Sequence, residues 1–541
     1  MHHRDIKMRR KGNRKALSSL QLGIIIAVVV IIVVAAVAAV LLIPHKPSVP
    51  VTSTTVPSSS VTFYTWWATE GKIALQHEIP AIQKSTGITL TPEIVPGAGG
   101  TNAKYAILSL IEAGKPPAAF QVHYGPEMAS YVEAAPNGIN SFVNLTSVAI
   151  KEGLTTNAVP AVLQAGAFNG TILSLPVDVH RGSLIWVNMN VLREYNLPFP
   201  YNLSTLQYDT MQLVEHGFTH PWMIPGADGG WDQLNVWEDI FLSLAGPQLY
   251  NEMIYGTINF NNATVQSLIN ETTNIFLNFT AYDYPGWQSL TWTQGLSYLV
   301  NGQVAFQVNG NWLTNYLYDF LNTTAYPPLP QYINNSSVKI IESPFPGTQH
   351  YYALVIDSVG IPVGPQESQA LKVAEFWSSY QGQEVWTKWK AVTFWKNGTD
   401  WYNTPAQWYD YQALLHTPEK DFVYQLSDGG LFDSTFGQII GDILTLQEVG
   451  KPDFSVWYGQ LQSVMHNEQQ EWLAAAKLGL GYLGFKEQPF AGYYPPWVTD
   501  PSAYGLDPAN MHSTVQTQGY SVLLLFPTIL VPVAFVSKLY L

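Results

Sequence analysis

The chain has 541 residues, which is more than one ordinary domain, so we expect at least two lobes. Only 12% of the residues are charged, while 47% are hydrophobic and 13% aromatic, and this balance suits a neutral, polyhydroxylated ligand. Residues 1–15 carry seven Lys or Arg and one Asp, which gives them a net charge of +6. Because the whole chain has a net charge of −14, the remaining residues have a net charge of −20. A body that acidic argues against nucleic acids and other polyphosphates as partners.

The first predicted element is a transmembrane helix behind a basic N-terminus. Residues 22–43 contain no charged side chain, and as an α-helix they span roughly 33 Å, enough to cross a bilayer core. Basic flanks stay in the cytoplasm, so we expect residues 1–21 inside the cell and everything after Ile43 outside. A buried core helix is the alternative, and the length and purity of the segment disfavour it.

The basic head also resembles the pilin-like signal of archaeal surface binding proteins, which a peptidase cuts on the cytoplasmic side. This resemblance implies cleavage near residues 16/17, between Ala16 and Leu17, with the apolar helix kept as an anchor. An uncleaved signal anchor has nearly the same sequence features, so both alternatives stay open.

A tether and an exported head are predicted after the helix. Residues 44–60 are rich in Pro, Ser and Thr and are expected to form an extended linker. The absence of cysteine excludes little, but Asn-X-Ser/Thr triplets are more frequent than chance placement gives, which favours a glycosylated outer surface. The candidate acceptors are Asn144, Asn169, Asn202, Asn262, Asn270, Asn278, Asn322, Asn334, Asn335 and Asn397.

Strand and helix patterns alternate through the body of the chain. Helices are predicted from about Thr69 and over 102–113, and Pro80 is expected to kink or divide the first of them. The alternation favours an α/β fold with parallel sheets covered by helices on both faces, and no fixed-period repeat indicates a solenoid. The predicted strands are 61–66, 87–95, 118–123, 173–177 and 184–187.

The C-terminal part is predicted to be a linker followed by an apolar tail. Residues 486–520 are rich in Pro, Gly and Tyr, and residues 521–541 are mostly apolar. Twenty apolar residues can span a membrane, but Pro527 and Pro532 weaken that interpretation, so a second membrane segment and a buried tail both stay open.

The sequence lacks the common enzyme and metal motifs. It has no P-loop, no His-Glu-X-X-His, no Gly-X-Ser-X-Gly and no cysteine cluster, and the glycines of 97–100 lack dinucleotide-binding spacing. His216 and His220 have helical spacing, but Gly217 and Pro221 disfavour a helix and therefore a metal site. We predict no catalysis, no metal and no cofactor, although 39 acidic residues leave room for the carboxylate pair of a glycosidase.

Aromatic and hydrogen-bonding residues occur together where several predicted strands end. Ligands of open α/β sheets bind beyond the carboxyl ends of the strands. An indole face can support the C–H face of a pyranose, and polar side chains can satisfy its hydroxyl groups. The alternative is that these residues only fill a core. They are Trp66, Trp67 and Glu70 after the first strand, Gln121 and His123 in the third, His180 after a later one, and Trp231, Trp237, Trp292 and Trp312 further along.

Six stretches make the chain resemble the family 1 extracellular solute-binding proteins, and more narrowly their glucose- and mannose-binding branch. The resemblance covers roughly 61–485 and implies an α/β, two-lobed periplasmic-binding-protein type II fold with interleaved lobes, as in maltose-binding protein. The stretches are 63–71 (FYTWWATEG), 96–103 (PGAGGTNA), 114–123 (GKPPAAFQVH), 176–181 (PVDVHR), 309–312 (NGNW) and 343–348 (SPFPGT).

The resemblance also implies a set of ligand-binding residues. Two positions depart from the bacterial pattern, because Asn311 replaces an Asp and Asp428 replaces a His, and these changes leave glucose, galactose, mannose or a pentose open. His180 is expected either to line the cleft or to act at a hinge. The complete predicted set is Trp66, Trp67, Glu70, Gln121, His123, His180, Trp231, Trp292, Asn311, Lys390 and Asp428.

The implied domain division has one lobe in 61–178 and 338–390 and the other in 181–318 and 395–485. The lobes are expected to close over a ligand by hinge motion. We therefore predict a cell-surface substrate-binding protein of an ABC sugar importer, anchored through residues 22–43, with the permease subunits and a neutral monosaccharide as partners. Glucose is the first candidate ligand, and galactose and mannose are the next. A surface-tethered carbohydrate-active enzyme and a pilus-like structural subunit are the alternatives.

Overall fold

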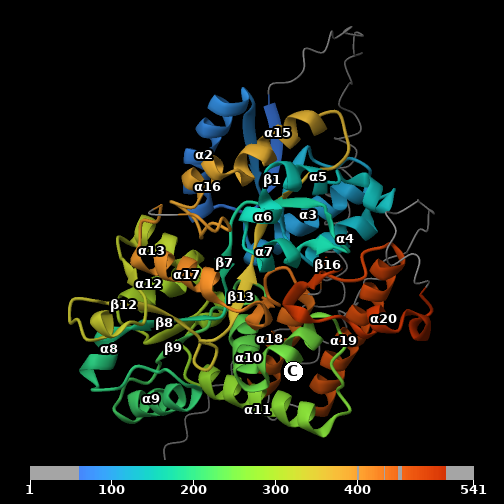
Figure 1. The fold of residues 1–541 in the computed structure, drawn as a ribbon. Coiled ribbons are helices and arrows are strands. Elements are labelled where there is room, and N and C mark those ends of the chain that lie inside the picture. The colour runs from blue at the N-terminus through green and yellow to red at the C-terminus, as the bar shows by residue number, and fades with distance from the viewer. Residues whose placement is uncertain (1–59, 399–400, 432, 449–453, 507–541) are drawn as a thin grey trace, which may run out of the picture. The chain divides into compact units, whose positions relative to one another are not determined.

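The computed structural model describes residues 60–398, 401–431, 433–448 and 454–506 (Figure 1). All of them belong to the second of two compact units, Met1–Pro57 and Ser58–Leu541. The predicted basic head, the apolar segment 22–43, most of the 44–60 linker and the apolar tail lie outside the described residues. In the described ranges no helix combines the length and the apolar character that crossing a membrane requires.

The first sheet holds strands in the order β2-β1-β3-β14-β6. β1, β2 and β3 are parallel, whereas β14 runs antiparallel to both β3 and β6. Every residue of β3 is buried, as expected for a central strand covered on both faces, whereas the side chains of β1 alternate between buried and half-buried. The strands are β1 (Ser60–Thr65), β2 (Thr89–Ile94), β3 (Ala119–His123), β6 (Ser174–Pro176) and β14 (Asp357–Gly360).

The second sheet has the order β11-β12-β8-β10-β9, and a three-stranded sheet, β15-β13-β7, accompanies it. In the second sheet β8 is antiparallel to both of its neighbours, β10 and β12. The strands are β7 (His180–Arg181), β8 (Leu184–Asn188), β9 (Trp222–Met223), β10 (Phe306–Val308), β11 (Ala325–Tyr326), β12 (Ile340–Pro344), β13 (Tyr352–Val355) and β15 (Phe422–Tyr424). Two further pairs are short hairpin ladders, β4 (Ala167–Phe168) with β5 (Thr171–Ile172) and β16 (Gly484–Phe485) with β17 (Gln488–Pro489).

Helices cover the sheets and pack on one another (Figure 1). α2, α3 and α15 contact strands of the first sheet, α10 and α12 contact strands of the second, and α11 and α18 pack on α10. The helices are α2 (Glu70–Thr86), α3 (Thr101–Glu112), α4 (Glu127–Ala134), α5 (Thr146–Lys151), α6 (Leu154–Asn157), α7 (Pro160–Ala165), α8 (Met189–Glu194), α9 (Leu203–Glu215), α10 (Trp231–Ile254), α11 (Ala263–Thr280), α12 (Trp292–Val300), α13 (Trp312–Leu321), α14 (Pro330–Ile333), α15 (Glu367–Ser378), α16 (Tyr380–Trp386), α17 (Pro405–His416), α18 (Asp433–Glu448), α19 (Phe454–Lys477) and α20 (Pro496–Thr499).

Three expectations about the fold need correction. The sheets are mixed and not parallel, because β14 and β8 run against their neighbours. Of the two alternatives expected for Pro80, division of the first helix is wrong, since α2 continues through it to Thr86. β12 belongs to the second sheet, where Ile341 pairs with Val187, whereas β14 belongs to the first, so the segment 338–390 contributes strands to both sheets.

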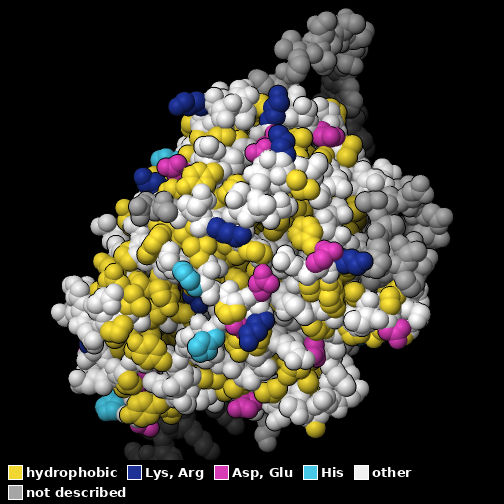
Figure 2. All heavy atoms as spheres, viewed as in Figure 1, with side chains coloured by type: hydrophobic (Ala, Val, Ile, Leu, Met, Phe, Trp, Pro, Cys, Tyr) yellow, Lys and Arg dark blue, Asp and Glu magenta, His cyan; other side chains and the backbone are white. Residues whose placement is uncertain are grey.

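Charged side chains are sparse on the face of the molecule that Figure 2 shows. Lys, Arg, Asp and Glu are scattered among neutral polar and apolar side chains. This agrees with the low content of charged residues in the sequence. It also means that the charges clustered in the interior, described next, stand out from the rest of the molecule.

Candidate functional site

Gln121 ties the ends of three strands of the first sheet together. Its Oε1 accepts hydrogen bonds from the Thr65 hydroxyl and, at 3.2 Å, from the backbone N–H of Trp66. Its Nε2 donates to Oδ1 of Asp357 at 2.7 Å. Because Thr65 ends β1 and Asp357 begins β14, the side chain of Gln121 fixes the edge of the sheet where Trp66 emerges.

His123 lies next to this arrangement, at the end of β3. Its ring centroid is 5.0 Å from that of Trp66, and its Nδ1 is 2.7 Å from Oε2 of Glu127. Its Nε2 is 4.0 Å from Oδ1 of Asp357, which is its cross-strand neighbour. The sequence therefore placed Gln121 and His123 correctly on one edge, and Asp357 joins them.

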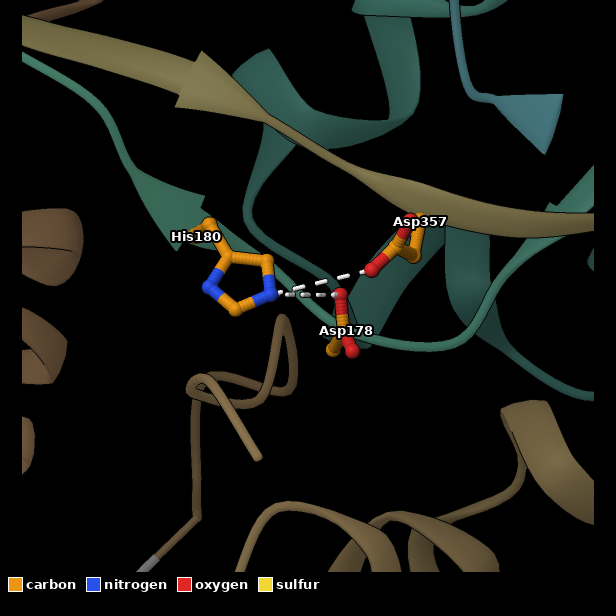
Figure 3. A group of neighbouring side chains, drawn as sticks. All are labelled: Asp178, His180 and Asp357. Atoms are coloured by element: carbon orange, nitrogen blue, oxygen red, sulfur yellow. Dashed lines mark ion pairs between the residues drawn. The ribbon is translucent and has the colours of Figure 1, made fainter. Parts of the chain in front are cut away.

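A buried charge cluster connects this edge to the strand β7. In Figure 3, Nε2 of His180 points between the carboxylates of Asp178 and Asp357, at 3.9 Å and 3.6 Å. Lys390 supplies the positive charge, because its Nζ is 2.9 Å from Asp357 Oδ2, 3.7 Å from Asp178 Oδ2 and in contact with His180 Nε2. The three ligand-type side chains could surround a metal ion by distance alone. The ammonium group of Lys390 already supplies the positive charge that a metal ion would bring to these carboxylates.

The pKa values in the cluster reflect this pairing. Burial raises the pKa of Asp178 to about 6, although Lys390 opposes the shift. Burial also raises the pKa of Asp357, but the charge of Lys390 and its other partners outweigh burial and hold that pKa well below its usual range. Burial lowers the pKa of Lys390, and the charges of Asp178, Asp357 and Glu70 reverse this, so that the pKa lies above its ordinary value. Glu70 is therefore electrostatically coupled to Lys390.

Asn311 and Trp312 join the cluster from the start of α13, which follows β10. Oδ1 of Asn311 is 2.6 Å from His180 Nδ1, and its Nδ2 donates to Oδ2 of Asp410 at 2.8 Å. The ring of Trp312 meets that of His180 edge-on, with centroids 5.4 Å apart. Trp312 also stacks on Trp231, with centroids 5.5 Å apart and planes 29° from parallel.

Trp231 and Asp428 complete the set on this side. The indole N–H of Trp231 donates to Oδ1 of Asp428 at 3.0 Å. Burial raises the pKa of Asp428, and nearby positive charges oppose that shift. The glycines of 97–100 come close to the same rings, because a Cβ on Gly99 would lie 2.9 Å from Trp231 and one on Gly100 would lie 3.0 Å from Trp66. Glycine is required here so that the backbone can pass between two indoles.

The rings of two predicted residues, Trp67 and Trp292, pack mainly outside these contacts. Trp67 is 3% exposed and packs against Phe63, Trp377 and Trp386 in the core, with Lys390 5.5 Å above its ring. Trp292 begins α12, where its backbone N–H donates to Asp228 and its ring meets Tyr316.

Sequence reasoning missed several buried charged partners. Glu127 follows His123 by four residues, a spacing that could have signalled a pair, and Asp178 lies inside one of the resembling stretches. Asp357 carried no local signal, because only strand pairing across more than 200 residues brings it to His123. Lys104 approaches from α3, where its ion pair with Glu127 was not predicted.

Comparison with known proteins gives one family and one fold. Residues 68–384 match the sequence model of the bacterial extracellular solute-binding proteins. The chain is 66% identical over 478 residues to the glucose-binding protein GlcS of Saccharolobus solfataricus, covering 88% of this chain and 85% of that one. It is 24% identical to an uncharacterized ABC transporter extracellular-binding protein of Pyrococcus horikoshii, over 76% of this chain and 89% of the relative.

Solved structures support the same fold. A chitin oligosaccharide binding protein superposes with a TM-score of 0.60 at 16% identity, covering 76% of this chain and 99% of that one. The bacterial solute receptor AcbH, described with an exclusive preference for β-D-galactopyranose, superposes with a TM-score of 0.58 at 14% identity, over 76% and 98% of the two chains.

Proposed function

This chain belongs to the bacterial extracellular solute-binding protein family, and from that premise we propose that it is the receptor of an ABC sugar importer that binds one neutral monosaccharide. D-Glucose is the first candidate, because a relative with 66% identity is a glucose-binding protein, and galactose and mannose follow. The chain binds and releases the sugar without transforming it.

One observation carries this proposal: hydrogen-bonding side chains and indole rings from both sheets form a continuous series of contacts. The series runs from Gln121 and Asp357 through Lys390 and His180 to Asn311. Trp66 and Trp231 are half-buried and lie beside it, and an indole can support the C–H face of a pyranose. Four of the eleven sugar-binding residues expected from the sequence, Gln121, His180, Asn311 and Lys390, are in this series.

The charges of the series favour a neutral ligand over an anion. Lys390 is balanced by Asp357 and Asp178, and Lys104 is balanced by Glu127. Neither ammonium group is left to neutralise a phosphate or a carboxylate. A sugar hydroxyl, in contrast, can donate to a carboxylate and accept from an N–H, and hydrogen bonds to charged groups contribute roughly 1.5–3 kcal/mol each. A few of these bonds supply the roughly 8 kcal/mol of micromolar binding.

Three buried indole nitrogens, Nε1 of Trp67, Trp312 and Trp377, have no acceptor among the described residues. The ring of Trp312 contacts that of His180 edge-on, and the ring of Trp67 lies beneath Lys390. A buried donor without an acceptor costs free energy, so a ligand oxygen that accepts from it is favoured. Trp312 therefore has a donor to offer the ligand beside His180, whereas the ring of Trp67 is assigned to the core.

The two departures from the bacterial pattern fit a redistribution of hydrogen bonds. Asn311 uses one lone pair on His180 and one N–H on Asp410, which leaves one of each for a hydroxyl group. Asp428 accepts from Trp231 and Ser427 and has further lone pairs for a sugar. Both residues are assigned to the ligand.

The remaining features concern where and how the receptor works. Residues 22–43 anchor it in the membrane with the head outside, and the permease subunits of the importer are its partners. The two sheets form the cores of two lobes that close over the sugar, with the linking segments around Val179 and Val392, which pair with each other, as part of the hinge. The exposed Asn side chains of the predicted triplets carry glycans.

Calorimetric titration of the full-length chain with D-glucose, D-galactose, D-mannose and D-xylose tests the proposal. We expect micromolar or tighter binding of one hexose and recovery of the sugar unchanged. Absence of binding to all four sugars, or conversion of a glycoside by the chain, would contradict it. Glucose 6-phosphate serves as the anionic control and should not bind.

A further inference from the structure

A buried carboxylate lies directly behind His123. Glu127 begins α4 and is 5% exposed. Its Oε2 is 2.7 Å from His123 Nδ1 and 3.2 Å from Lys104 Nζ, and its Oε1 accepts from the Tyr131 hydroxyl at 3.1 Å. Three groups from β3, α3 and α4 therefore hold this carboxylate in one position.

The chemistry of this contact decides which nitrogen of His123 carries a proton. Burial raises the pKa of Glu127, but the positive charges of Lys104 and His123 outweigh burial and hold the pKa at about 2. Glu127 is thus ionised at every pH above that value and can only accept. Nδ1 of His123 must be the donor, whether the imidazole is neutral or protonated.

Four charged groups face the imidazole of His123. They are Glu127 on α4, Lys104 on α3, Asp357 on β14 and Asp428 after β15. Burial lowers the pKa of His123, and the charge of Lys104 lowers it too, while Glu127 and Asp357 raise it. The sum places the pKa above its ordinary value.

We propose that Glu127 is a positioning residue for ligand binding, which holds the Nδ1 proton of His123 so that only Nε2 meets the sugar. This inference rests on the proposed function, because it assigns His123 to the ligand. Nε2 lies 4.0 Å from Asp357 Oδ1, which is too far for a direct hydrogen bond. A hydroxyl group between them can accept from a protonated His123 and donate to Asp357.

The protonation state of His123 then sets the strength of binding. In the imidazolium, Nε2 donates to the sugar oxygen, and in the neutral ring Nε2 becomes an acceptor that competes with Asp357 for the same hydroxyl proton. Binding is strongest below the pKa of His123 and weakens as the pH rises through it. Because Glu127 raises that pKa and Lys104 lowers it, the two residues have opposite effects on the pH range of binding.

NMR of the ¹⁵N-histidine-labelled, sugar-free, full-length chain tests the assignment without any ligand. The His123 signals are identified by their loss in His123→Asn. We expect Nδ1 to stay protonated across the titration while Nε2 titrates. Glu127→Gln keeps an acceptor oxygen but removes the charge, so the pKa of His123 falls by about one unit or more. Lys104→Met removes the opposing charge, so the pKa rises.

The pH profile of D-glucose binding should follow the same order. The midpoint moves to lower pH in Glu127→Gln and to higher pH in Lys104→Met. Tyr131→Phe, which removes only a hydroxyl from Glu127 and keeps both charges, is the matched control and should move it by less than half as much as Glu127→Gln. A general loss of packing lowers the melting temperature in every variant but does not produce shifts of opposite sign.

The inference is overturned if the pKa of His123 is unchanged in Glu127→Gln, or if both charge variants shift it in the same direction. Should Glu127→Gln not fold, Lys104→Met decides alone, and an unchanged or lower pKa contradicts the proposal. If the unmodified chain binds none of the four sugars, the proposed function fails, while the sugar-free titration still decides whether Glu127 fixes the Nδ1 proton.

Discussion

Removing the buried ammonium group of Lys390 should destabilise the protein in a pH-dependent way. Lys390→Met leaves the carboxylates of Asp357 and Asp178, 2.9 Å and 3.7 Å from the lost Nζ, without their cation. Stranding a buried charge in this way costs about 3–5 kcal/mol of unfolding free energy at pH 7. Lys72→Met, at an exposed site on α2, is the control and should stay within about 0.5 kcal/mol of the unmodified chain.

The pH dependence follows from the two carboxyl groups. The folded pKa of Asp357 is depressed, so its contribution is present above its unfolded pKa and is lost as the pH falls. The folded pKa of Asp178 is about 6 and rises further without Lys390. The variant therefore loses the most unfolding free energy at pH values where Asp178 must ionise. Urea unfolding followed by tryptophan fluorescence should therefore show a larger loss at pH 7 than at pH 4. A variant within 1 kcal/mol of the unmodified chain at pH 7, or a larger loss at pH 4, would refute this reasoning.

Three further predictions concern single residues. Glu70→Ala should cost about 2 kcal/mol of glucose binding by calorimetry, because Glu70 is buried and coupled to Lys390; an unchanged affinity removes Glu70 from the site. Trp67→Ala should cost about 3–5 kcal/mol of unfolding free energy, because it opens a cavity between Trp377 and Trp386. Weaker sugar binding at an unchanged melting temperature would contradict this and show that the ring contacts the ligand. Mass spectrometry of glycopeptides should find Asn169 unmodified, because its Nδ2 donates to the Gly479 carbonyl, whereas exposed Asn270 and Asn278 on α11 should carry glycans; a glycan on Asn169 contradicts this.

The strands next to the site could be predicted because their apolar runs are continuous. β3 is buried at every position, and the sequence pattern at 118–123 gives it to within one residue. β8 is likewise found at 184–187, one residue short of its end. The direction and partners of these strands could not be predicted, because β14 and β12 arrive from distant parts of the chain and pair antiparallel.

The sequence predicted where polar side chains lie along the strand ends better than it predicted their contacts. Gln121 and His123 alternate on a strand, so their common face follows from strand geometry. The indoles Trp66 and Trp67 are adjacent in the chain and point to opposite surroundings, one to His123 and one into the core. Aromatic content alone cannot separate these two environments, because an indole fills a core as well as it supports a sugar.

The buried ion pairs were the least predictable part of the site. Lys390 was assigned to the ligand, but its partners Asp178 and Asp357 come from segments more than 30 residues away in sequence. A lone acidic residue on a strand usually faces solvent, and only the fold reveals that these acids face a lysine.

A crystal structure of the chain with D-glucose tests the central claim most directly. The account predicts one glucose molecule within hydrogen-bond distance of His123 Nε2 and Asp357 Oδ1, with its ring against Trp66 or Trp231. Glucose bound away from both sheets, or no glucose at a concentration that saturates the chain in solution, would contradict it.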